Sequence, residues 1–310
     1  MQTCATYPIF LLRRLLAALD EASLANDAVN ASLVLADMFE ASVEYVHAVR
    51  PPGPAMQVFE VVKAVAKGRD PLQPVIERTL ECVRATFARS GRSADGVAEH
   101  VHVVQGHPAQ VILERARANA VDLIVMGALR RRTLVDFGST ARAVLTHARC
   151  PVWIQPGPVV PIKKILVPYD HSTDSAHALS AACELARRYG ASVLALHCFE
   201  SLPVASSMAW GGYLGPDTLD AFVRSGADEF NTAMRNFDWK EVPHEHRFTE
   251  GSAVETILQH GEKADLIVMG SHGRTRLASA LLGSVAYGVL KGTSKAVMIV
   301  RDSATEYQLT

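Results

Sequence analysis

Three glycines and a serine in the C-terminal half stand at a spacing that suits anion binding. Gly270, Gly273, Gly283 and Ser284 form the pattern G-x2-G-x9-G-[ST]. Because glycine has no Cβ, the backbone N–H groups beside it can approach a phosphate closely. Gly283 and Ser284 open a segment with helical spacing, and the start of a helix offers unpaired N–H groups and the positive end of its dipole. The pattern therefore predicts a phosphate site.

Asp170 adds a carboxylate to this chemistry. It follows directly on the apolar, strand-like residues 163–169. A carboxylate at that place can accept hydrogen bonds from an amine or a ribose hydroxyl, or contact a phosphate-bound metal ion. Two plainer interpretations stay open: Asp170 could cap the helix that follows, since Asp is favoured there, and the glycines could serve only turns and helix packing.

Other catalytic patterns are missing from the sequence. It contains no G-x-S-x-G elbow, no Walker G-K-[ST] and no kinase-type base, so no catalytic residue is assigned and metal ligands stay unknown. A zinc site at the HxH pattern of His244 and His246 would need further ligands. The five cysteines form no CxxC pair, which favours reduced thiols in the cytoplasm over a disulfide framework.

Strand and helix signals alternate along both halves. In the second half we expect strands at residues 163–169, 191–199, 246–249, 266–269 and 296–300, and helices at 175–189, 217–236, 253–263 and 280–291. In the first half we expect strands near residues 9–19, 42–49, 99–104, 123–126 and 152–155. Such alternation predicts a parallel sheet covered on both faces by helices. Ligands of these sheets bind beyond the carboxyl ends of the strands, where Asp170 and Gly270 are expected.

The chain repeats itself. The hexapeptide Asp-Leu-Ile-Val-Met-Gly occurs at residues 122–127 and again at 265–270, and residues 20–49 match 170–199 without gaps. Residues 155–161 hold three prolines and one glycine and suit a linker. We therefore expect an α/β protein of two tandem doubly wound, Rossmann-like domains, residues 1–155 and 156–310, each with a five-stranded parallel sheet.

The charge balance and the lengths of the apolar runs indicate which classes of partner the protein lacks. The 31 basic and 32 acidic side chains give a formal net charge of −1, which argues against an electrostatic nucleic-acid binder or a membrane-surface protein. No apolar run approaches the roughly 18 residues needed to cross a bilayer. We expect a soluble, cytoplasmic protein that binds neither nucleic acid nor membrane.

With these motifs the sequence resembles the universal stress protein family over essentially its whole length. The flanking residues agree as well: Lys-Ile-Leu-Val-Pro at 164–168, Leu-His at 196–197 and Gly-Ser-His-Gly-Arg-Thr at 270–275. The resemblance implies an adenine-nucleotide site for ATP, ADP or AMP, with Mg²⁺ bound through the phosphates. Asp170 and the backbone of Cys198 would hold the adenosine end. The implied site residues are Pro168, Tyr169, Asp170, Cys198, Met269, Gly270, His272, Gly273, Gly283, Ser284 and Val285.

The first half departs from this pattern. Arg130 stands three residues after Gly127, where the second half has a glycine, and ten residues separate Gly127 from Gly138 against twelve between Gly270 and Gly283. A shorter loop with three arginines cannot wrap phosphates by the same backbone geometry. We expect this half not to hold ATP in that manner, although its arginines could contact another anion or the ligand of the partner domain.

The leading functional hypothesis is an ATP-binding protein with a regulatory role in the stress response and one nucleotide per chain. The alternatives are a slow Mg-dependent ATPase, an interaction scaffold that binds no nucleotide, and an adenylate sensor. The resemblance also implies an internal pseudo-dimer of the two domains, paired through their last strands at residues 152–155 and 297–300. That arrangement leaves a surface for a further homodimer, which is a hypothesis.

Overall fold

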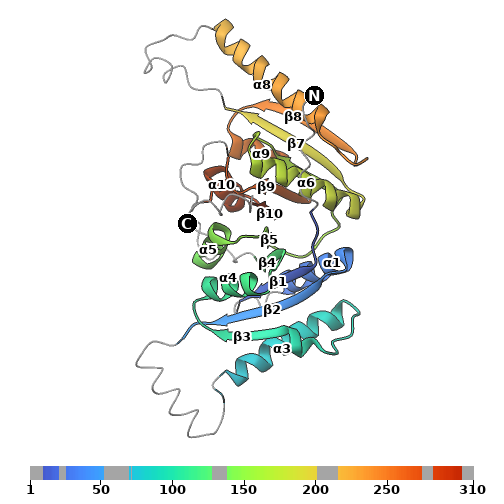
Figure 1. The fold of residues 1–310 in the computed structure, drawn as a ribbon, viewed down its shortest axis with the longest axis vertical. Coiled ribbons are helices and arrows are strands. Elements are labelled where there is room, and N and C mark those ends of the chain that lie inside the picture. The colour runs from blue at the N-terminus through green and yellow to red at the C-terminus, as the bar shows by residue number, and fades with distance from the viewer. Residues whose placement is uncertain are drawn as a thin grey trace. The chain divides into compact units, whose positions relative to one another are not determined.

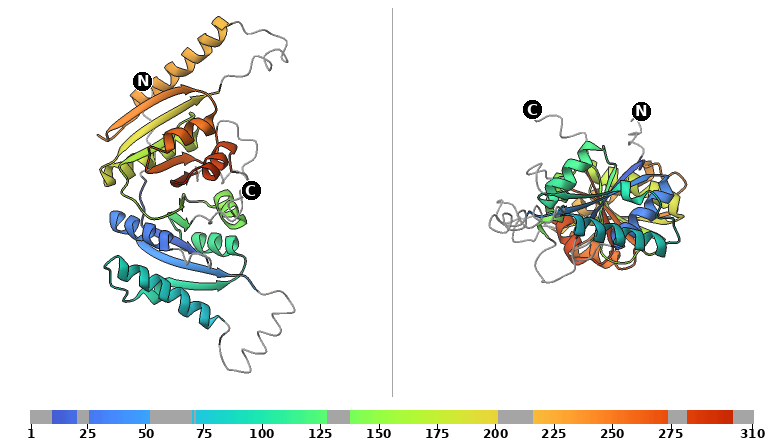
Figure 2. Two further views of the ribbon diagram at one scale, coloured as in Figure 1. Left: turned by 180° about the vertical axis from the view of Figure 1, so that it is seen from behind. Right: turned by 90° about the horizontal axis from the view of Figure 1, so that it is seen from below.

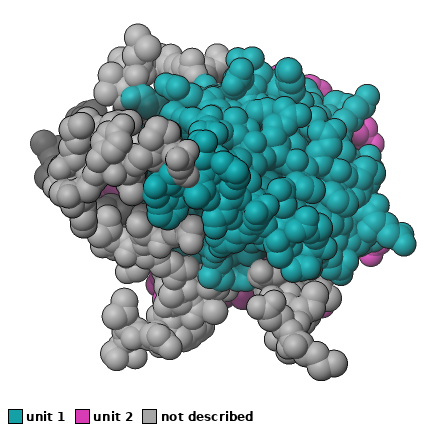
Figure 3. All heavy atoms as spheres, turned by 90° about the horizontal axis from the view of Figure 1, so that it is seen from above, with its two compact units in different colours: residues 1–10, 160–310 teal, residues 11–159 magenta. Residues whose placement is uncertain are grey.

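The chain divides into two compact units, which are described here one at a time (Figure 3). The computed structural model describes residues 10–20, 26–51, 70, 72–127, 138–200, 216–273 and 282–301. One unit comprises residues 11–159, and the other comprises residues 160–310 together with residues 1–10. The domain limits expected from the sequence, 1–155 and 156–310, stay a prediction, as do the pseudo-dimer and the homodimer.

The first unit is built around five parallel strands in the order β3-β2-β1-β4-β5 (Figure 1). Its elements are β1 (Arg14–Leu19), α1 (Asn26–Phe39), β2 (Ser42–Val49), α3 (Gln73–Arg89), a 3-10 turn (Val97–His100), β3 (Val101–Gln105), α4 (Pro108–Ala118), β4 (Leu123–Gly127), α5 (Ser139–His147) and β5 (Val152–Gln155).

The second unit repeats this plan with the strand order β10-β9-β6-β7-β8. Its elements are β6 (Lys164–Pro168), α6 (Thr173–Tyr189), β7 (Ser192–Phe199), α8 (Pro216–Asn236), β8 (His244–Glu250), α9 (Ala253–Gly261), β9 (Leu266–Gly270), α10 (Ser284–Gly292) and β10 (Ala296–Val300). The predicted class, two tandem doubly wound α/β units with five-stranded parallel sheets, is confirmed.

The strand order reverses direction beside β6. From β6 the chain moves outward through β7 to β8, and it then returns to β9 and β10 on the other side of β6. Because the crossovers are right-handed, α6 and α8 cover one face of the sheet and α9 and α10 the other (Figure 2). The loops after β6 and β9 leave in opposite directions, and this reversal opens the crevice at the carboxyl ends of the two strands.

The strands are buried because helices cover both faces. All five residues of β10 are buried, as are the first four of β9. On α6 a long row of small and apolar residues packs against the sheet, with Ala178, Leu179, Ala182 and Leu185 fully excluded from solvent. Such strands show continuous apolar runs instead of alternation, which is why the sequence pattern predicted them.

The repeated hexapeptide has a structural role in both units. Its first residue, Asp122, accepts hydrogen bonds from the backbone N–H groups of Arg13 and Arg14 at 2.8 Å each. In the second unit Asp265 accepts the corresponding bonds from Lys163 and Lys164 at 2.8 and 3.0 Å. Each aspartate therefore fixes the start of the first strand of its unit against the fourth.

Several element boundaries differ from the prediction, and four of these differences have a physical reason. The first strand was predicted over residues 9–19, but β1 begins at Arg14, where Asp122 holds the backbone. Residues 97–100 form a 3-10 turn, so β3 begins two residues later than predicted. The edge strand β8 extends beyond the predicted 246–249 at both ends. Its terminal residues are exposed and polar, so they give no strand pattern in the sequence. The last helix was predicted from residue 280, but Gly283 has ψ 148° and α10 begins at Ser284.

None of the helices in the part of the chain that the structure describes is both long and apolar enough to span a bilayer.

Candidate functional site

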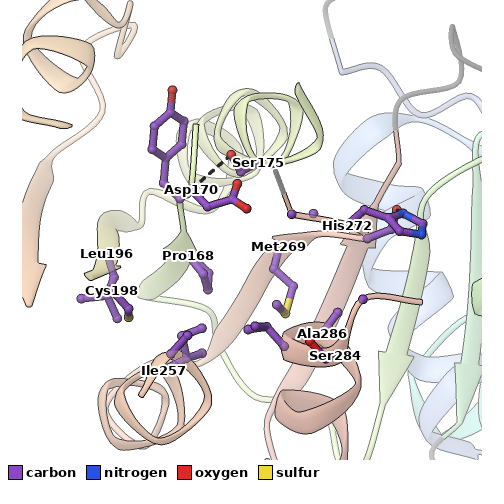
Figure 4. Close-up of a pocket in the computed structure, with 17 residues that line it drawn as sticks. Pro168, Asp170, Ser175, Leu196, Cys198, Ile257, Met269, His272, Ser284 and Ala286 are labelled. Carbon is purple, nitrogen blue, oxygen red and sulfur yellow. Dashed lines mark hydrogen bonds between the residues drawn. The ribbon is translucent and has the colours of Figure 1, made fainter. Parts of the chain in front are cut away.

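A cavity of about 310 Å³ lies at the carboxyl ends of β6, β7 and β9 in the second unit (Figure 4). Every residue that the sequence named as a site residue lines it: Pro168, Tyr169, Asp170, Cys198, Met269, Gly270, His272, Gly273, Gly283, Ser284 and Val285. The lining also includes residues that the sequence did not single out, namely Ser175, Leu196, Ala253, Ile257, Ser271 and Ala286. Figure 4 shows Asp170 and Ser175 on one side of the cavity, Ser284 and Ala286 on the opposite side, and Met269 between them.

Asp170 is fixed by the turn that begins α6. Its Oδ1 accepts hydrogen bonds from the backbone N–H of Ser172 at 3.0 Å and from its hydroxyl at 2.6 Å. Ser172, and not Asp170, is the N-cap of α6, since its hydroxyl accepts from the N–H of Ser175. The interpretation of Asp170 as the cap is therefore wrong in detail: the aspartate holds the residue that caps the helix.

The second carboxylate oxygen of Asp170 faces the loop after β9. A Cβ added to Gly273 would lie 2.8 Å from Oδ2, which is closer than any real Cβ contact. Gly273 therefore brings backbone directly against the acid. One oxygen of Asp170 is occupied by the turn, and the other lies against the loop after β9.

The start of α10 lines the cavity with Gly283, Ser284, Val285 and Ala286. Gly283 donates its N–H to the carbonyl of Ser271 at 2.9 Å, and a Cβ on Gly283 would lie 3.0 Å from that oxygen. The helix begins at Ser284, so the N–H groups of Ser284, Val285 and Ala286 belong to its first turn and have no acceptor within the helix. All three residues line the cavity, so this helix start suits a phosphate or another oxyanion.

Gly270 has a packing role. A Cβ there would lie 2.8 Å from the Cβ of Asp174 and 3.0 Å from the backbone nitrogen of Ser175. The glycine therefore lets the end of β9 touch the first turn of α6. Packing accounts for Gly270 against α6 and for Gly283 against the backbone of Ser271, whereas Gly273 lies against Asp170, which lines the cavity.

An apolar wall completes the cavity. Leu196, Ile257 and Met269 are buried side chains, and Cys198 lies beside them. Burial raises the pKa of the Cys198 thiol to about 11, and the hydrogen bond with Thr256 offsets only part of this. The thiol is therefore uncharged at neutral pH and extends a wall that suits a flat apolar ring such as a nucleobase.

A buried polar cluster beside the cavity was not anticipated from the sequence. Asp174 is 2% exposed and Ser271 is fully buried, and the hydroxyl of Ser271 donates to Asp174 Oδ2 at 2.7 Å. The same oxygen accepts from the backbone N–H of His272 at 3.2 Å, and His272 Nδ1 lies 2.8 Å from the Ser271 hydroxyl. Asp174 carries no sequence signal, since acids are common in the first turn of any helix.

His272 is not a solvent-facing residue. Its side chain is 14% exposed and lies against Ser271. Because the serine hydroxyl donates its hydrogen to Asp174, the imidazole Nδ1–H is the donor in the contact between His272 and Ser271. The backbone N–H of His272 is donated to Asp174, so this loop position offers a phosphate no free backbone donor.

His47 and His197, at equivalent places in the repeat, have a structural role. The Nδ1–H of His197 donates to the carbonyl of Tyr169 at 2.7 Å, and His47 makes the same bond to Leu19 at 3.1 Å. Each histidine joins the ends of two neighbouring strands. His244 stacks on Trp239 with ring centroids 4.0 Å apart. The described residues include no group of three or more His, Cys, Asp or Glu side chains that could hold a metal ion.

The first unit has a cavity of about 430 Å³ at the corresponding place. Its lining includes Asp20, Met126, Gly138 and Ser139, the counterparts of Asp170, Met269, Gly283 and Ser284. Arg130 and its two neighbouring arginines lie outside the described residues. The expectation that this half does not hold ATP in the manner of the second stays a prediction.

Comparisons with known proteins agree with the repeat. The model of the universal stress protein family matches twice, at residues 12–156 and 161–301. A universal stress protein of Mycobacterium tuberculosis is 28% identical over 197 residues, which cover 60% of this chain and 64% of that protein. The matched part thus spans less than two thirds of that relative's length.

Solved structures share the fold. A universal stress protein from Archaeoglobus fulgidus superimposes with a TM-score of 0.59 at 17% identity, over 94% of this chain and 97% of that one. A universal stress protein in complex with cAMP is also matched, with 23% identity over 46% of this chain and a TM-score of 0.30. The Archaeoglobus structure agrees with the two-unit α/β fold described above.

Proposed function

The chain belongs to the universal stress protein family, and we propose that its second unit binds one adenine nucleotide, ATP in the first instance, as part of a regulatory role in the stress response. The observation that supports this most directly is the composition of one cavity. A carboxylate that can accept hydrogen bonds lies on one side, and a helix start with free N–H groups lies on the other. A nucleotide carries the complementary groups, donors on its base and ribose and anionic phosphates at its other end.

The residues fit such a ligand. Gly273 keeps backbone directly beside Asp170 Oδ2, and Gly283 lets the start of α10 pack on the Ser271 carbonyl at the edge of the cavity. Asp170 Oδ2 would accept from the ribose or the base, and the wall of Leu196, Ile257 and Met269 would cover the base. The N–H groups at the start of α10 would bind phosphate oxygens. A bound nucleotide would also supply phosphate oxygens as ligands for Mg²⁺.

The first test is the amount of nucleotide that the protein carries. We would purify the whole chain, denature it, identify any released nucleotide by mass spectrometry and measure nucleotide per chain. We expect about one ATP or ADP per chain, and Gly283→Val should abolish it because the added side chain would collide with the Ser271 carbonyl. Two nucleotides per chain would show that the first unit also binds.

Two variants distinguish the effect of the Asp170 charge on binding from an effect of substitution on folding. Asp170→Asn keeps an oxygen that can accept from Ser172 but removes the charge. We expect the ATP dissociation constant to rise about tenfold, which corresponds to one charge-assisted hydrogen bond. Gly157→Ala is the control, because a Cβ there meets nothing within 4 Å. If neither purified protein nor protein given millimolar Mg-ATP binds nucleotide, the scaffold alternative replaces this proposal.

A further inference from the structure

Asp174 links the two chain segments that flank the phosphate end of the cavity. It lies in the first turn of α6, where the N-terminal end of the helix dipole stabilises a carboxylate. Its Oδ2 accepts from the hydroxyl of Ser271 and from the N–H of His272, both directly after β9. A side chain that is 2% exposed and charged is costly to bury, and these donors compensate for the loss of water.

Ser271 is held from three directions at once. Its N–H donates to the carbonyl of Val300 in β10 at 2.8 Å, and its hydroxyl donates to Asp174 in α6. Its carbonyl accepts the N–H of Gly283 at 2.9 Å, which fixes the residue that precedes α10. Hydrogen bonds therefore connect Asp174 to the start of α10 through one residue, Ser271.

The first unit lacks these polar groups. In the registers that match residues 20–49 with 170–199 and 122–127 with 265–270, the counterparts of Asp174, Ser271 and His272 are Leu24, Ala128 and Leu129. These three lie outside the described residues, so the contrast is one of side-chain chemistry. The repeat does not retain the acid and its two polar partners, which points to a role in the second cavity alone.

We propose that Asp174 is a positioning residue that confers affinity for the phosphate end of the ligand. By holding Ser271 and His272, it fixes the carbonyl that orients Gly283 and so directs the N–H groups at the start of α10 toward the phosphates. The residues proposed for the adenosine end are Asp170, Cys198 and Ile257. The inference rests on the proposed function and adds a residue that determines which adenine compounds bind tightly.

The test compares ATP with adenosine by isothermal titration on the whole protein. Asp174→Asn keeps an acceptor oxygen but loses the charge, and we expect the ATP dissociation constant to rise about tenfold while that of adenosine changes less than about twofold. Asp220→Asn is the control, since Asp220 is an exposed acid on α8 whose Arg224 partner lies 3.9 Å away. A purely structural role would weaken both ligands equally.

A second variant controls for the possibility that Asp174→Asn misfolds. Replacing Asp174, Ser271 and His272 together by Leu, Ala and Leu installs the side chains of the first unit and leaves no buried carboxylate or hydroxyl without a partner. We expect this triple variant to keep its adenosine affinity and lose at least about tenfold in ATP affinity.

Equal losses for both ligands, or unchanged ATP affinity in either variant, would overturn the positioning role. A wild-type protein that binds neither compound would instead overturn the proposed function.

Discussion

Gly273 and Asp170 approach each other so closely that a single methyl group would separate them. A Cβ at residue 273 would lie 2.8 Å from Asp170 Oδ2, and the carboxylate cannot easily withdraw because Ser172 holds its other oxygen. We expect Gly273→Ala to raise the ATP dissociation constant about tenfold, since displacing one charged acceptor costs that order of affinity. Fluorescence titration with a labelled ATP analogue would measure it.

The control for this change is the melting temperature of the ligand-free protein. Because Gly273 lies beside a cavity and not in the core, the Ala variant should melt close to the wild type. A variant with unchanged ATP affinity would show that the loop moves away from Asp170 at no cost.

Cys198 should behave as an inert part of the cavity wall. Burial raises its pKa to about 11, so below pH 9 only a small fraction is the reactive thiolate. We expect alkylation by iodoacetamide, followed by peptide mass spectrometry, to be slow at pH 7 and to accelerate as the pH rises toward 11. Cys198→Ser should retain ATP affinity within about twofold, because the backbone of this residue is the expected contact. Rapid labelling at pH 7 would contradict the buried thiol.

Which site residues the sequence could reveal depends on how they act. Asp170, Gly273 and Gly283 were predictable because glycine is selected wherever backbone must come close, and because a strand end places an acid at the crevice. Asp174 and Ser271 were not predictable. Their hydrogen bond joins α6 to the end of β9, and it exists only because Gly270 lets those two segments touch.

At the scale of elements, α6 offers a stability test that depends on pH. Burial raises the pKa of Glu184, but hydrogen bonds from Arg187 and Arg188 outweigh it and lower the pKa below its ordinary value of 4.5. A lowered pKa in the folded protein means that the stabilisation is present above pH 4.5 and is lost as the pH falls through the folded value.

Glu184→Gln should therefore reduce the free energy of unfolding by about 1 kcal/mol at pH 7, a modest amount because Arg187 is largely exposed. Urea denaturation at several pH values would measure it. The difference from wild type should shrink as the pH falls below 4.5. A difference that stays constant with pH would mean that packing, and not the charge, accounts for the effect.

The elements themselves were well predicted where burial was complete and poorly where it was not. The strands β9 and β10 are apolar throughout, and their positions followed from the sequence alone. The exposed edge strand β8 gave almost no signal, since most of its side chains are polar and solvent-facing. The beginning of α10 was misplaced because the dihedral angles of Gly283 depend on its bond to Ser271, a tertiary contact.

At the scale of the molecule, the same α/β fold occurs in both units, but some residues near the two cavities differ. Both units keep the aspartate that fixes the first strand and the histidine that joins two strand ends. The two cavities share an acid and a serine, Asp20 and Ser139 in the first unit and Asp170 and Ser284 in the second. They differ at the Asp174 cluster, where the sequence of the first unit has Leu24, Ala128 and Leu129. Conserved positions thus maintain the fold, and the differing ones are where ligand preference should differ.

The difference between the two units predicts that a nucleotide stabilises only the second unit. At a free ATP concentration of 100 times the dissociation constant, a ligand that binds only the folded state adds about 2.7 kcal/mol. Amides of the second unit that exchange through its unfolding should then slow about a hundredfold. Hydrogen-exchange mass spectrometry would show this in peptides from β6, β9 and α10, with no change in β1, β4 and α5. Gly283→Val should abolish the protection, whereas equal protection of both units would mean that the first cavity also binds ATP or that the two units unfold together.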